Sequence, residues 1–381
     1  MSAPTAVRNQ GMDNTMPSTT PTAPAKKQRD PYFSNAKFGL IALVICGHSW
    51  SDLLDGSNSV YAFYMTLYNF HMPAFIFISG YFSKTFSGKP HQLKRLITGV
   101  MVPYVIFSLI LGLLKIWTDD KFQANLLTPF YITWFLAALF VWRLTAPFWH
   151  ILRFPVLIAT LISIGAIFLE LPGTLDLGRI LQFLPFFVAG MFMRREHFSM
   201  LQRPIVRVVG TLLSLGILVM SFMYAGELDR NWIYFNEGAE QMDLDPISAL
   251  PLKIALMASA AILIATYLSW VPQKQLPFTH LGDHTMYPYL LHGVLIITLI
   301  DGVGLYDLVP FVHTGPGAIV VTLTAIAAAF VLSSKPVRVI TGPIVEPKLD
   351  WIFKREKKTG DEPAASTVSG PTASGSSSSK Q

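Results

Sequence analysis

The chain has little cysteine and little charge, and each shortage narrows what it can be. Its single cysteine, Cys46, lies inside an apolar run, so no disulfide can form within the 381 residues. A buried cysteine of this kind is more often a small hydrophobe than a catalytic nucleophile. Charged residues make up 14% of the chain and hydrophobic residues 52%, a balance that excludes an ordinary soluble domain.

The basic residues do not indicate nucleic-acid binding, although the formal net charge is +6. The lysines and arginines gather at the ends of apolar segments instead of forming one long basic stretch. That distribution is typical of a membrane protein, in which basic loops set the orientation. We therefore expect no nucleic-acid partner.

Apolar runs of about 20 residues, the length that crosses a bilayer core, recur along the chain. The runs are continuous and not alternating, which favours helices over strands. We expect an all-α integral membrane protein, with a disordered tail at 1–33, about ten transmembrane helices within 34–345, and a mostly disordered tail at 346–381. The N-terminal tail has no apolar segment of the signal-peptide type. The ten spans are expected to begin near Asn35, Val60, Leu96, Phe130, Phe154, Gly178, Ile205, Ala249, Met286 and Pro316.

The loops between these runs alternate in charge. One set is basic and contains Lys84, Lys89, Lys94, Arg95, Arg153, Arg194, Arg195, Arg203, Arg207 and Lys274. The other set is mainly acidic and contains Asp52, Asp55, Asp119, Asp120, Glu170, Asp176, Glu227, Asp229, Glu237, Glu240, Asp243, Asp245, Asp301 and Asp307. Because basic loops stay in the cytoplasm, both tails are predicted to be cytoplasmic, which requires an even number of spans.

Lys37 and His48 are the ionisable residues of the first span, and their separation is informative. Eleven residues are close to three helical turns, so both side chains lie on one face, about 16–17 Å apart along the helix. Lys37 is expected at the cytoplasmic mouth, where an isolated lysine could also simply snorkel. His48 is expected at mid-membrane depth, where an ionisable group indicates a functional site by default.

Two further histidines are expected near the depth of His48, and no carboxylate of the spans lies between the three imidazoles. His71 lies in the second span, where Pro73 should kink the helix, and His292 lies in the ninth. His71 could alternatively be only a structural donor at the kink. His292 could be only a hydrogen-bonding residue between helices.

Three more cationic residues are expected on the cytoplasmic side. Lys94 and Arg95 lie in a loop where a cytoplasmic polyanion would arrive, and such side chains form strong contacts with phosphate. Their alternative role is to set the topology. Arg143 approaches the cytoplasmic face of the fourth span and could equally snorkel.

Arg179 and Trp134 are candidates on the outer side. Arg179 lies at the outer start of the sixth span, where arginine is disfavoured, and it could bind an anion or a sugar hydroxyl. Its alternative is an ion pair with Asp176 or Glu170. Trp134 could stack on a sugar or belong to an interfacial aromatic belt.

A long donor could reach His48 from the cytoplasm along the face that begins with Lys37. A pantetheine arm has that length, with its phosphates at the basic mouth and its thioester at the imidazole. His48 would then act as general base on an acceptor hydroxyl. Attack on the thioester carbonyl develops an oxyanion, for which His71 or Arg179 could supply a donor.

Six motifs, taken in order, resemble the membrane acyltransferase-3 family over residues 29–350. They are NAKFGLIALVICGHSW, NFHMPAFIFISGYF, KRLITGVMVPY, TWFLAALFVWRL, LQFLPFFVAGMFMRR and LGDHTMYPYLLHG. Within the family, the chain is most similar to the fucose 4-O-acetylase-like acyltransferases. The resemblance implies about ten transmembrane helices. It also implies transfer of an acetyl or other short acyl group from acyl-CoA to a hydroxyl, usually on an envelope carbohydrate.

The resemblance assigns the family's basic-X10-His motif to Lys37 and His48, and its FHMP histidine to His71. Three departures accompany it. The family usually has arginine where this chain has Lys37, which lacks the bidentate fork. Many members carry aspartate two or three residues earlier, where this chain has serine and asparagine. The Arg-X-X-Arg loop of relatives has only an approximate counterpart in His91–Arg95.

We therefore expect a multi-pass O-acyltransferase of the plasma membrane, in the first instance an O-acetyltransferase. Its donor would be acetyl-CoA or another acyl-CoA, its acceptor a sugar, polysaccharide or glycolipid, and no metal is expected. The alternatives are a transporter with a histidine proton relay, which would lack the usual internal repeat, and a non-catalytic scaffold. The candidate residues are His48 and His71 for catalysis, Lys37, Lys94, Arg95 and Arg143 for acyl-CoA, and Arg179, Trp134 and His292 for the acceptor or the oxyanion.

Cysteine labelling tests the predicted topology. In a Cys46→Ala background, a Glu237→Cys protein should react with an impermeant thiol reagent on intact cells, because the acidic 226–248 loop should face outward. A Ser377→Cys protein should react only after the cells are opened. Labelling of the Ser377→Cys protein on intact cells would rule out the predicted orientation.

Overall fold

The computed structural model of the protein describes residues 30–119 and 125–353, which fold mainly into helices and contain no strand. The all-α prediction is therefore confirmed for this part of the chain, and most of the two predicted disordered tails lies outside it. The α-helices are α1 (Pro31–Trp50), α2 (Asn58–Tyr68), α3 (His71–Ser83), α4 (Pro90–Leu96), α5 (Val102–Asp119), α6 (Trp134–Trp149), α7 (Pro155–Gly165), α8 (Leu177–Gln182), α9 (Leu184–Phe192), α10 (Arg195–Leu201), α11 (Pro204–Met223), α12 (Asn231–Tyr234), α13 (Pro246–Trp270), α14 (Met286–Ile296), α15 (Leu305–Leu308), α16 (Gly315–Leu332) and α17 (Lys335–Val345).

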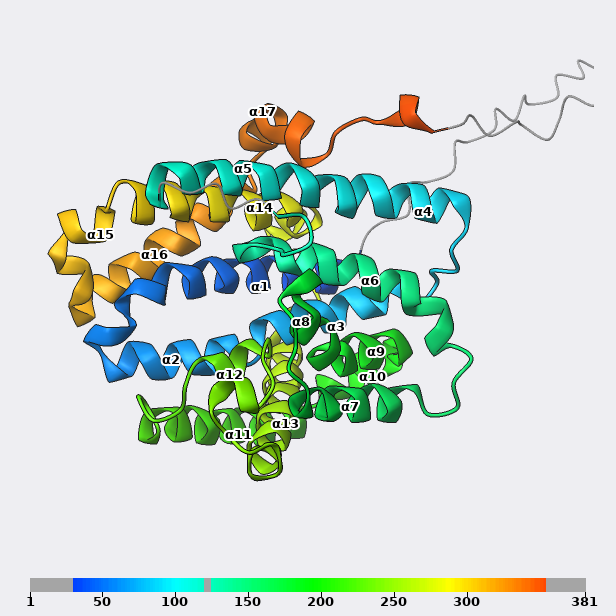
Figure 1. Cartoon of the computed structure of the whole chain (residues 1–381), viewed down its shortest axis with the longest axis horizontal. Coiled ribbons are helices and arrows are strands. Elements are labelled where there is room, and N and C mark those ends of the chain that lie inside the picture. The colour runs from blue at the N-terminus through cyan, green and yellow to red at the C-terminus, as the bar shows by residue number, and fades with distance from the viewer. Residues whose placement is uncertain (1–29, 120–124, 354–381) are drawn as a thin grey trace, which may run out of the picture.

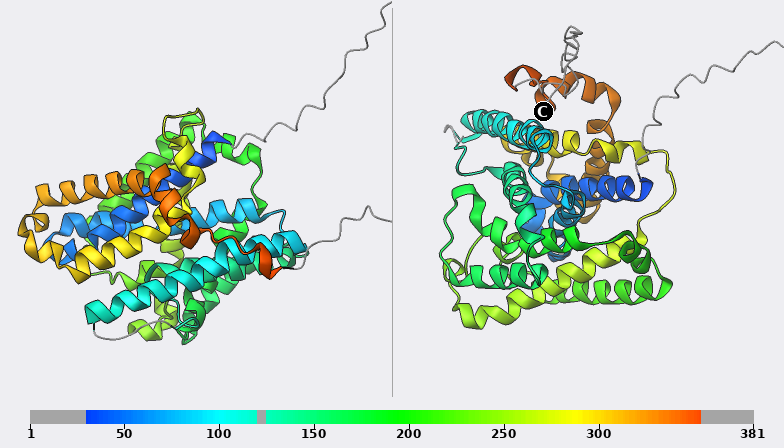
Figure 2. Two further views of the ribbon diagram at one scale, coloured as in Figure 1. Left: turned by 90° about the horizontal axis from the view of Figure 1, so that it is seen from above. Right: turned by 90° about the vertical axis from the view of Figure 1, so that its right-hand side faces the viewer.

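The long helices form a bundle around α1 (Figure 1). α1 contacts α2, α3, α14 and α16, and α2 and α3 follow one another in the direction opposite to α1. α17 lies outside the bundle against α5 and α14. Both ends of the described chain leave at the same end of the bundle, as the two further views also show (Figure 2). This arrangement is the one that an even number of crossings produces.

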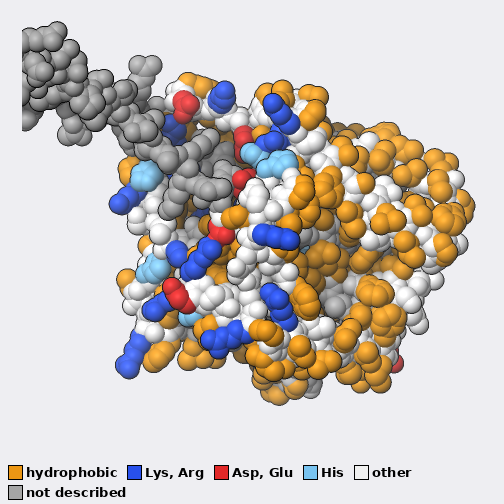
Figure 3. All heavy atoms as spheres, turned by 180° about the vertical axis from the view of Figure 1, so that it is seen from behind, with side chains coloured by type: hydrophobic (Ala, Val, Ile, Leu, Met, Phe, Trp, Pro, Cys, Tyr) orange, Lys and Arg blue, Asp and Glu red, His pale blue; other side chains and the backbone are white. Residues whose placement is uncertain are grey.

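Charge is distributed unevenly along the bundle axis. On the face shown in Figure 3, lysine and arginine side chains gather at the end from which the described chain leaves, together with a few carboxylates. The opposite end of that face is mainly hydrophobic. Two of the ion pairs at the charged end join segments far apart in the chain, Arg195 with Asp30 and Lys94 with Asp350. The Lys94 ammonium lowers the pKa of the Asp350 carboxyl.

Six helices of the described residues are long and apolar enough to cross a membrane by themselves. They are Pro31–Gly56, Pro90–Thr118, Tyr131–Trp149, Pro204–Met223, Pro246–Trp270 and Gly315–Leu332. The other four predicted spans correspond to broken or shorter segments: the α2–α3 pair, Pro155–Phe168, the pair Thr174–Gln182 and Leu184–Phe192 bent by 55°, and Met286–Gly302. A multi-pass architecture is thus established, whereas ten complete crossings stay a prediction.

The second predicted span is interrupted beside His71. α2 ends at Tyr68 and α3 begins at His71, with Asn69 and Phe70 between them. Pro73 lies in the first turn of α3, where its missing N–H does least harm within the new helix. The predicted kink is therefore confirmed, and it is a break between two helices.

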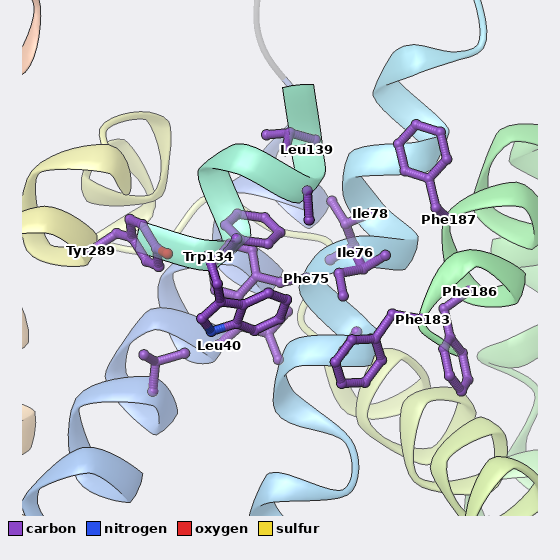
Figure 4. Close-up of a cluster of buried hydrophobic side chains, with 14 of the residues drawn as sticks. Leu40, Phe75, Ile76, Ile78, Trp134, Leu139, Phe183, Phe186, Phe187 and Tyr289 are labelled. Atoms are coloured by element: carbon purple, nitrogen blue, oxygen red, sulfur yellow. The ribbon is translucent and has the colours of Figure 1, made fainter. Parts of the chain in front are cut away.

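Close contact between α3 and α9 holds the centre of the bundle together. The backbone at Gly80 meets the carbonyl of Phe187, and the backbone at Gly190 meets the carbonyl of Phe77, so a side chain at either glycine would collide with the facing helix. Small residues allow membrane helices to approach in this way. Figure 4 shows the surrounding apolar cluster, to which α3 contributes Ile76 and Ile78 and α9 contributes Phe186 and Phe187.

We expect Gly80→Ala to lower the thermal midpoint of the purified protein by several degrees, because overpacking a helix contact costs about 1–3 kcal/mol. The matched control is Gly165→Ala, since a Cβ at Gly165 meets no atom within 4 Å. Fluorescence-detected melting in one detergent provides the comparison. Equal midpoints for the two variants would contradict a tight α3–α9 contact.

Candidate active site

A cavity of about 280 Å³ lies between α1, α2, α3, α8 and the segment that contains α12. It brings together four of the residues predicted from the sequence: His48, His71, Arg179 and Trp134. The complete lining is Val44, His48, Ser51, Tyr64, Tyr68, His71, Met72, Tyr131, Ile132, Trp134, Arg179, Phe183, Ile233, Tyr234 and Tyr289. The cavity therefore combines polar groups with a wall that is mostly aromatic.

His48 lies near the C-terminal end of α1, with its side chain half-buried against aromatic rings. α1 is continuous from Pro31 to Trp50, so Lys37 and His48 keep the three-turn register predicted for them. The Tyr68 hydroxyl lies 3.4 Å from Nδ1 of His48, and the ring centroids of Tyr131 and His292 lie 5.0 and 5.2 Å from that of His48. The sequence predicted only a similar depth for His292, and the structure places its ring beside that of His48.

His71 and His292 are both fully buried, and each ring is held by a backbone carbonyl four residues earlier, in α2 for His71 and within α14 for His292. Nδ1 of His71 lies 2.8 Å from the carbonyl oxygen of Leu67, and Nδ1 of His292 lies 2.9 Å from that of Pro288. A carbonyl oxygen can only accept, so both Nδ1 atoms carry the proton and both Nε2 atoms are acceptors in the neutral rings. Neither Nε2 has a hydrogen-bond partner. The structural role considered for His71, as a donor at the kink, is therefore present. His292 bonds within α14 and not between helices, and each ring still leaves one free acceptor.

Arg179 is the cation that lines this cavity. Its guanidinium forms an ion pair with Asp176, as one of the alternatives from the sequence proposed, and lies 4.9 Å from the ring centroid of Trp134. Its Nε also donates to the carbonyl of Tyr234, at 3.3 Å. Trp134 is buried and stacks on Phe183, so it belongs to the cavity wall and not to a lipid-facing belt.

Tyr64 and Tyr68, which the sequence did not single out, line the cavity together with Tyr131 and Tyr234. The Tyr64 ring stacks on that of Tyr68 with centroids 4.0 Å apart, and its hydroxyl lies 2.6 Å from that of Tyr234. Tyr234 and Ile233 come from the 226–248 loop, which was predicted to face outward. Tyr131 has a left-handed backbone conformation with φ of 53°, which is strained for a non-glycine residue next to His48.

The cations predicted to bind acyl-CoA do not line the cavity. Lys37 and Arg143 both reach the C-terminal end of α3: Nζ of Lys37 lies 5.7 Å from the Phe82 ring centroid, and Nε of Arg143 lies 3.2 Å from the Ser83 hydroxyl. Lys94 forms its 2.8 Å ion pair with Asp350, while Arg95 is exposed. An anionic ligand at Lys94 would therefore compete with Asp350.

Lys253, a buried lysine that was not predicted from the sequence, anchors the 226–248 loop. Lys253 of α13 is 1% exposed, donates to Oε1 of Gln182 at 2.6 Å, and lies 3.9 Å from the Phe235 ring centroid. Gln182 in turn donates to the carbonyl of Glu237 at 2.8 Å. The sequence does point to Lys253, because it is the only charged residue in the apolar run 246–270. Through these contacts Lys253 fixes the segment that carries Tyr234.

We expect Lys253→Met to loosen residues 233–239 without unfolding the bundle. Removal of the ammonium deprives Gln182 and Phe235 of their contact, while it also removes the cost of a buried charge. Hydrogen exchange of this segment should accelerate about fivefold, since a net hydrogen bond contributes about 1 kcal/mol. Lys274→Met, at an exposed position, is the control. Unchanged exchange in the Lys253→Met protein would show that Lys253 is merely tolerated.

Comparison with known families adds an independent observation. The family model Acyl_transf_3, described as an acyltransferase domain, matches residues 30–334, which include every helix from α1 to α16. Comparisons with curated proteins and with solved structures gave no match. The matched stretch contains the cavity and the apolar helices around it. The chain therefore belongs to the acyltransferase-3 family and is a membrane acyltransferase.

Proposed function

We propose that the protein transfers an acyl group, most simply acetyl, from acyl-CoA to a hydroxyl of an envelope carbohydrate or glycolipid. His48 is the general base of this reaction. The observation that carries the proposal is the position of His48 in a cavity, on the same continuous helix as Lys37 and three turns away from it. The proposed family subgroup is that of the fucose 4-O-acetylase-like acyltransferases.

The donor enters from the end of the bundle that carries Lys37. Lys37 and Arg143 both contact the last residues of α3, and two cations in one region can hold the phosphates of CoA. The separation of about 16–17 Å between Lys37 and His48 suits an extended pantetheine arm. Lys94 joins the phosphate site only when Asp350 releases it.

The transfer itself needs a base that can take up a proton and return it. His48 removes the proton of the acceptor hydroxyl, and the hydroxyl oxygen bonds to the thioester carbonyl carbon. The resulting oxyanion collapses, the carbon–sulfur bond breaks, and His48 returns the proton to the departing thiolate. The products are an ester and free CoA, with no change of oxidation state.

Arg179 is a better donor to the oxyanion than neutral His71. The guanidinium carries several N–H donors, whereas the single N–H of the neutral His71 ring is already given to Leu67. The free Nε2 atom of His71, which lines the cavity, can instead accept a hydrogen bond. An unpartnered acceptor in an aromatic cavity suits a hydroxyl-rich substrate, since every sugar hydroxyl can donate one hydrogen bond.

The acceptor approaches from the opposite end of the bundle, where Tyr234 and Ile233 border the cavity. In this proposal the basic end of Figure 3 faces the cytoplasm, both tails are cytoplasmic, and the protein crosses the plasma membrane ten times. A transporter with a histidine relay accounts for intramembrane imidazoles, but not for membership of an acyltransferase family.

Three substitutions test the assigned roles. His48→Ala and His48→Gln should both lose transfer, by about 10²–10⁴-fold, because neither side chain can take up the proton. His71→Asn should be milder, since its amide can still donate to the Leu67 carbonyl where Nδ1 does now. Transfer of radiolabelled acetyl from acetyl-CoA, at matched protein levels in membranes, is the measurement. A His48→Gln protein with near wild-type transfer would remove the central assignment.

A further inference from the structure

A large groove lies on the side of the bundle where α11 packs against α2 and α13. Its volume is about 980 Å³, and residues such as Leu212, Met220, Leu252 and Leu256 make its walls mainly apolar. None of the residues of α11 is buried, so α11 is a peripheral helix that contacts the bundle through α2 and α13. A hydrocarbon chain suits such a groove, because contact with apolar walls removes the chain from water.

One polar group in the lining does not suit a purely hydrocarbon occupant. Asn69 is 3% exposed, and its Nδ2 donates to the Ser259 hydroxyl oxygen at 2.6 Å. The Ser259 hydroxyl itself donates to the Leu256 carbonyl at 3.0 Å, so it can only accept from Asn69. This fixes the orientation of the Asn69 amide and leaves Oδ1 without a partner. Because Asn69 lines the groove, a ligand there that carries a hydrogen-bond donor would satisfy this buried acceptor.

The groove adjoins the catalytic cavity. Ile233 lines both spaces, and on α2 the neighbouring residues Tyr64 and Met65 face the cavity and the groove respectively. At the end of α2 the same division recurs, with Tyr68 in the cavity and Asn69 in the groove. The wall between the two spaces is therefore one helix thick, and Asn69 lies at the break in it.

We propose that the groove binds the hydrocarbon chain of a lipid-borne alcohol, whose hydroxyl end lies beside Asn69 on its way to the cavity. This proposal rests on the proposed acyl transfer and specifies its acceptor as a molecule held in the membrane by its chain. A phosphatidylcholine of the surrounding bilayer fills the same apolar space, but it has no donor for Oδ1 of Asn69.

Photolabelling in nanodiscs of unlabelled phosphatidylcholine tests the proposal. The probe is hexadecanol with a diazirine in its chain, and the reference is a phosphatidylcholine with a diazirine in one acyl chain. Peptides of α11 and α13 should be labelled preferentially by the alcohol. Gly216→Phe should reduce that labelling by about tenfold, because the ring displaces about two methylenes from the groove. A Cβ at Gly216 meets no atom within 4 Å, so the phenyl ring can be accommodated.

Two controls make the result decisive. Gly165→Phe places the same ring on another open glycine and should leave the labelling unchanged. Asn69→Leu should reduce labelling by the alcohol and not labelling by the phosphatidylcholine. Equal labelling by both probes, or labelling that Gly216→Phe leaves intact, would mean that ordinary bilayer lipid occupies the groove and would overturn the proposal.

The binding measurement is independent of the chemistry proposed for His48. A His48→Gln protein should be labelled like the wild type, since His48 does not line the groove. If His48→Gln keeps its transfer activity while groove labelling persists, the base assignment fails and the groove site stands. If the labelling loses its selectivity while His48→Gln is inactive, the lipid-borne acceptor fails and the proposed transfer stands.

Discussion

The hydrogen bond from the His71 ring to the carbonyl of Leu67 joins the two halves of a broken helix pair and sets the chemistry of the cavity. The helix is interrupted at Asn69 and Phe70, beside Pro73. The Leu67 carbonyl in the last turn of α2 accepts from the backbone N–H of Phe70 at 3.1 Å and from Nδ1 of His71 at 2.8 Å, so the ring is tied across the break. Since that nitrogen is committed to the backbone, the Nε2 lone pair is the part of the ring that remains available. The break therefore determines both the position of the imidazole and which of its atoms can meet a substrate.

The three clustered histidines differ because their Nδ1 partners differ. His292 repeats the arrangement of His71, with its proton donated to the carbonyl of Pro288. The Nδ1 contact of His48 is instead with the Tyr68 hydroxyl, which can donate or accept. Only His48 is therefore free to exchange tautomers, and a group that takes up a proton and later returns it needs that freedom. This distinction supports His48, and not its neighbours, as the base.

Much of the helix content and the centre of the site could be predicted from the sequence, because both depend on local periodicity. The shared helix face of Lys37 and His48 follows from the number of residues per helical turn, and the interruption beside His71 follows from Pro73. Contacts between distant segments could not be derived in this way. The ion pair of Lys94 with Asp350 depends on where the segment after α17 returns, and no pattern in either segment encodes that path. Tyr64 and Tyr68 were missed for a similar reason, since a tyrosine in an apolar run looks the same whether it meets lipid, a neighbouring helix or a cavity.

The short segment around α12 borders both the cavity and the groove. Tyr234 closes the cavity through Tyr64 and Arg179, whereas its neighbour Ile233 borders both the cavity and the groove. Lys253 contacts Gln182 and Phe235 and so ties this segment to α13, at the cost of burying a charge. The donor side, by contrast, is built from the ends of α1 and α3, which are parts of the rigid bundle. In the proposed reaction, recognition of the acceptor would therefore reside in an anchored loop and the route of the donor in the helices, so that the two could vary independently around the same His48.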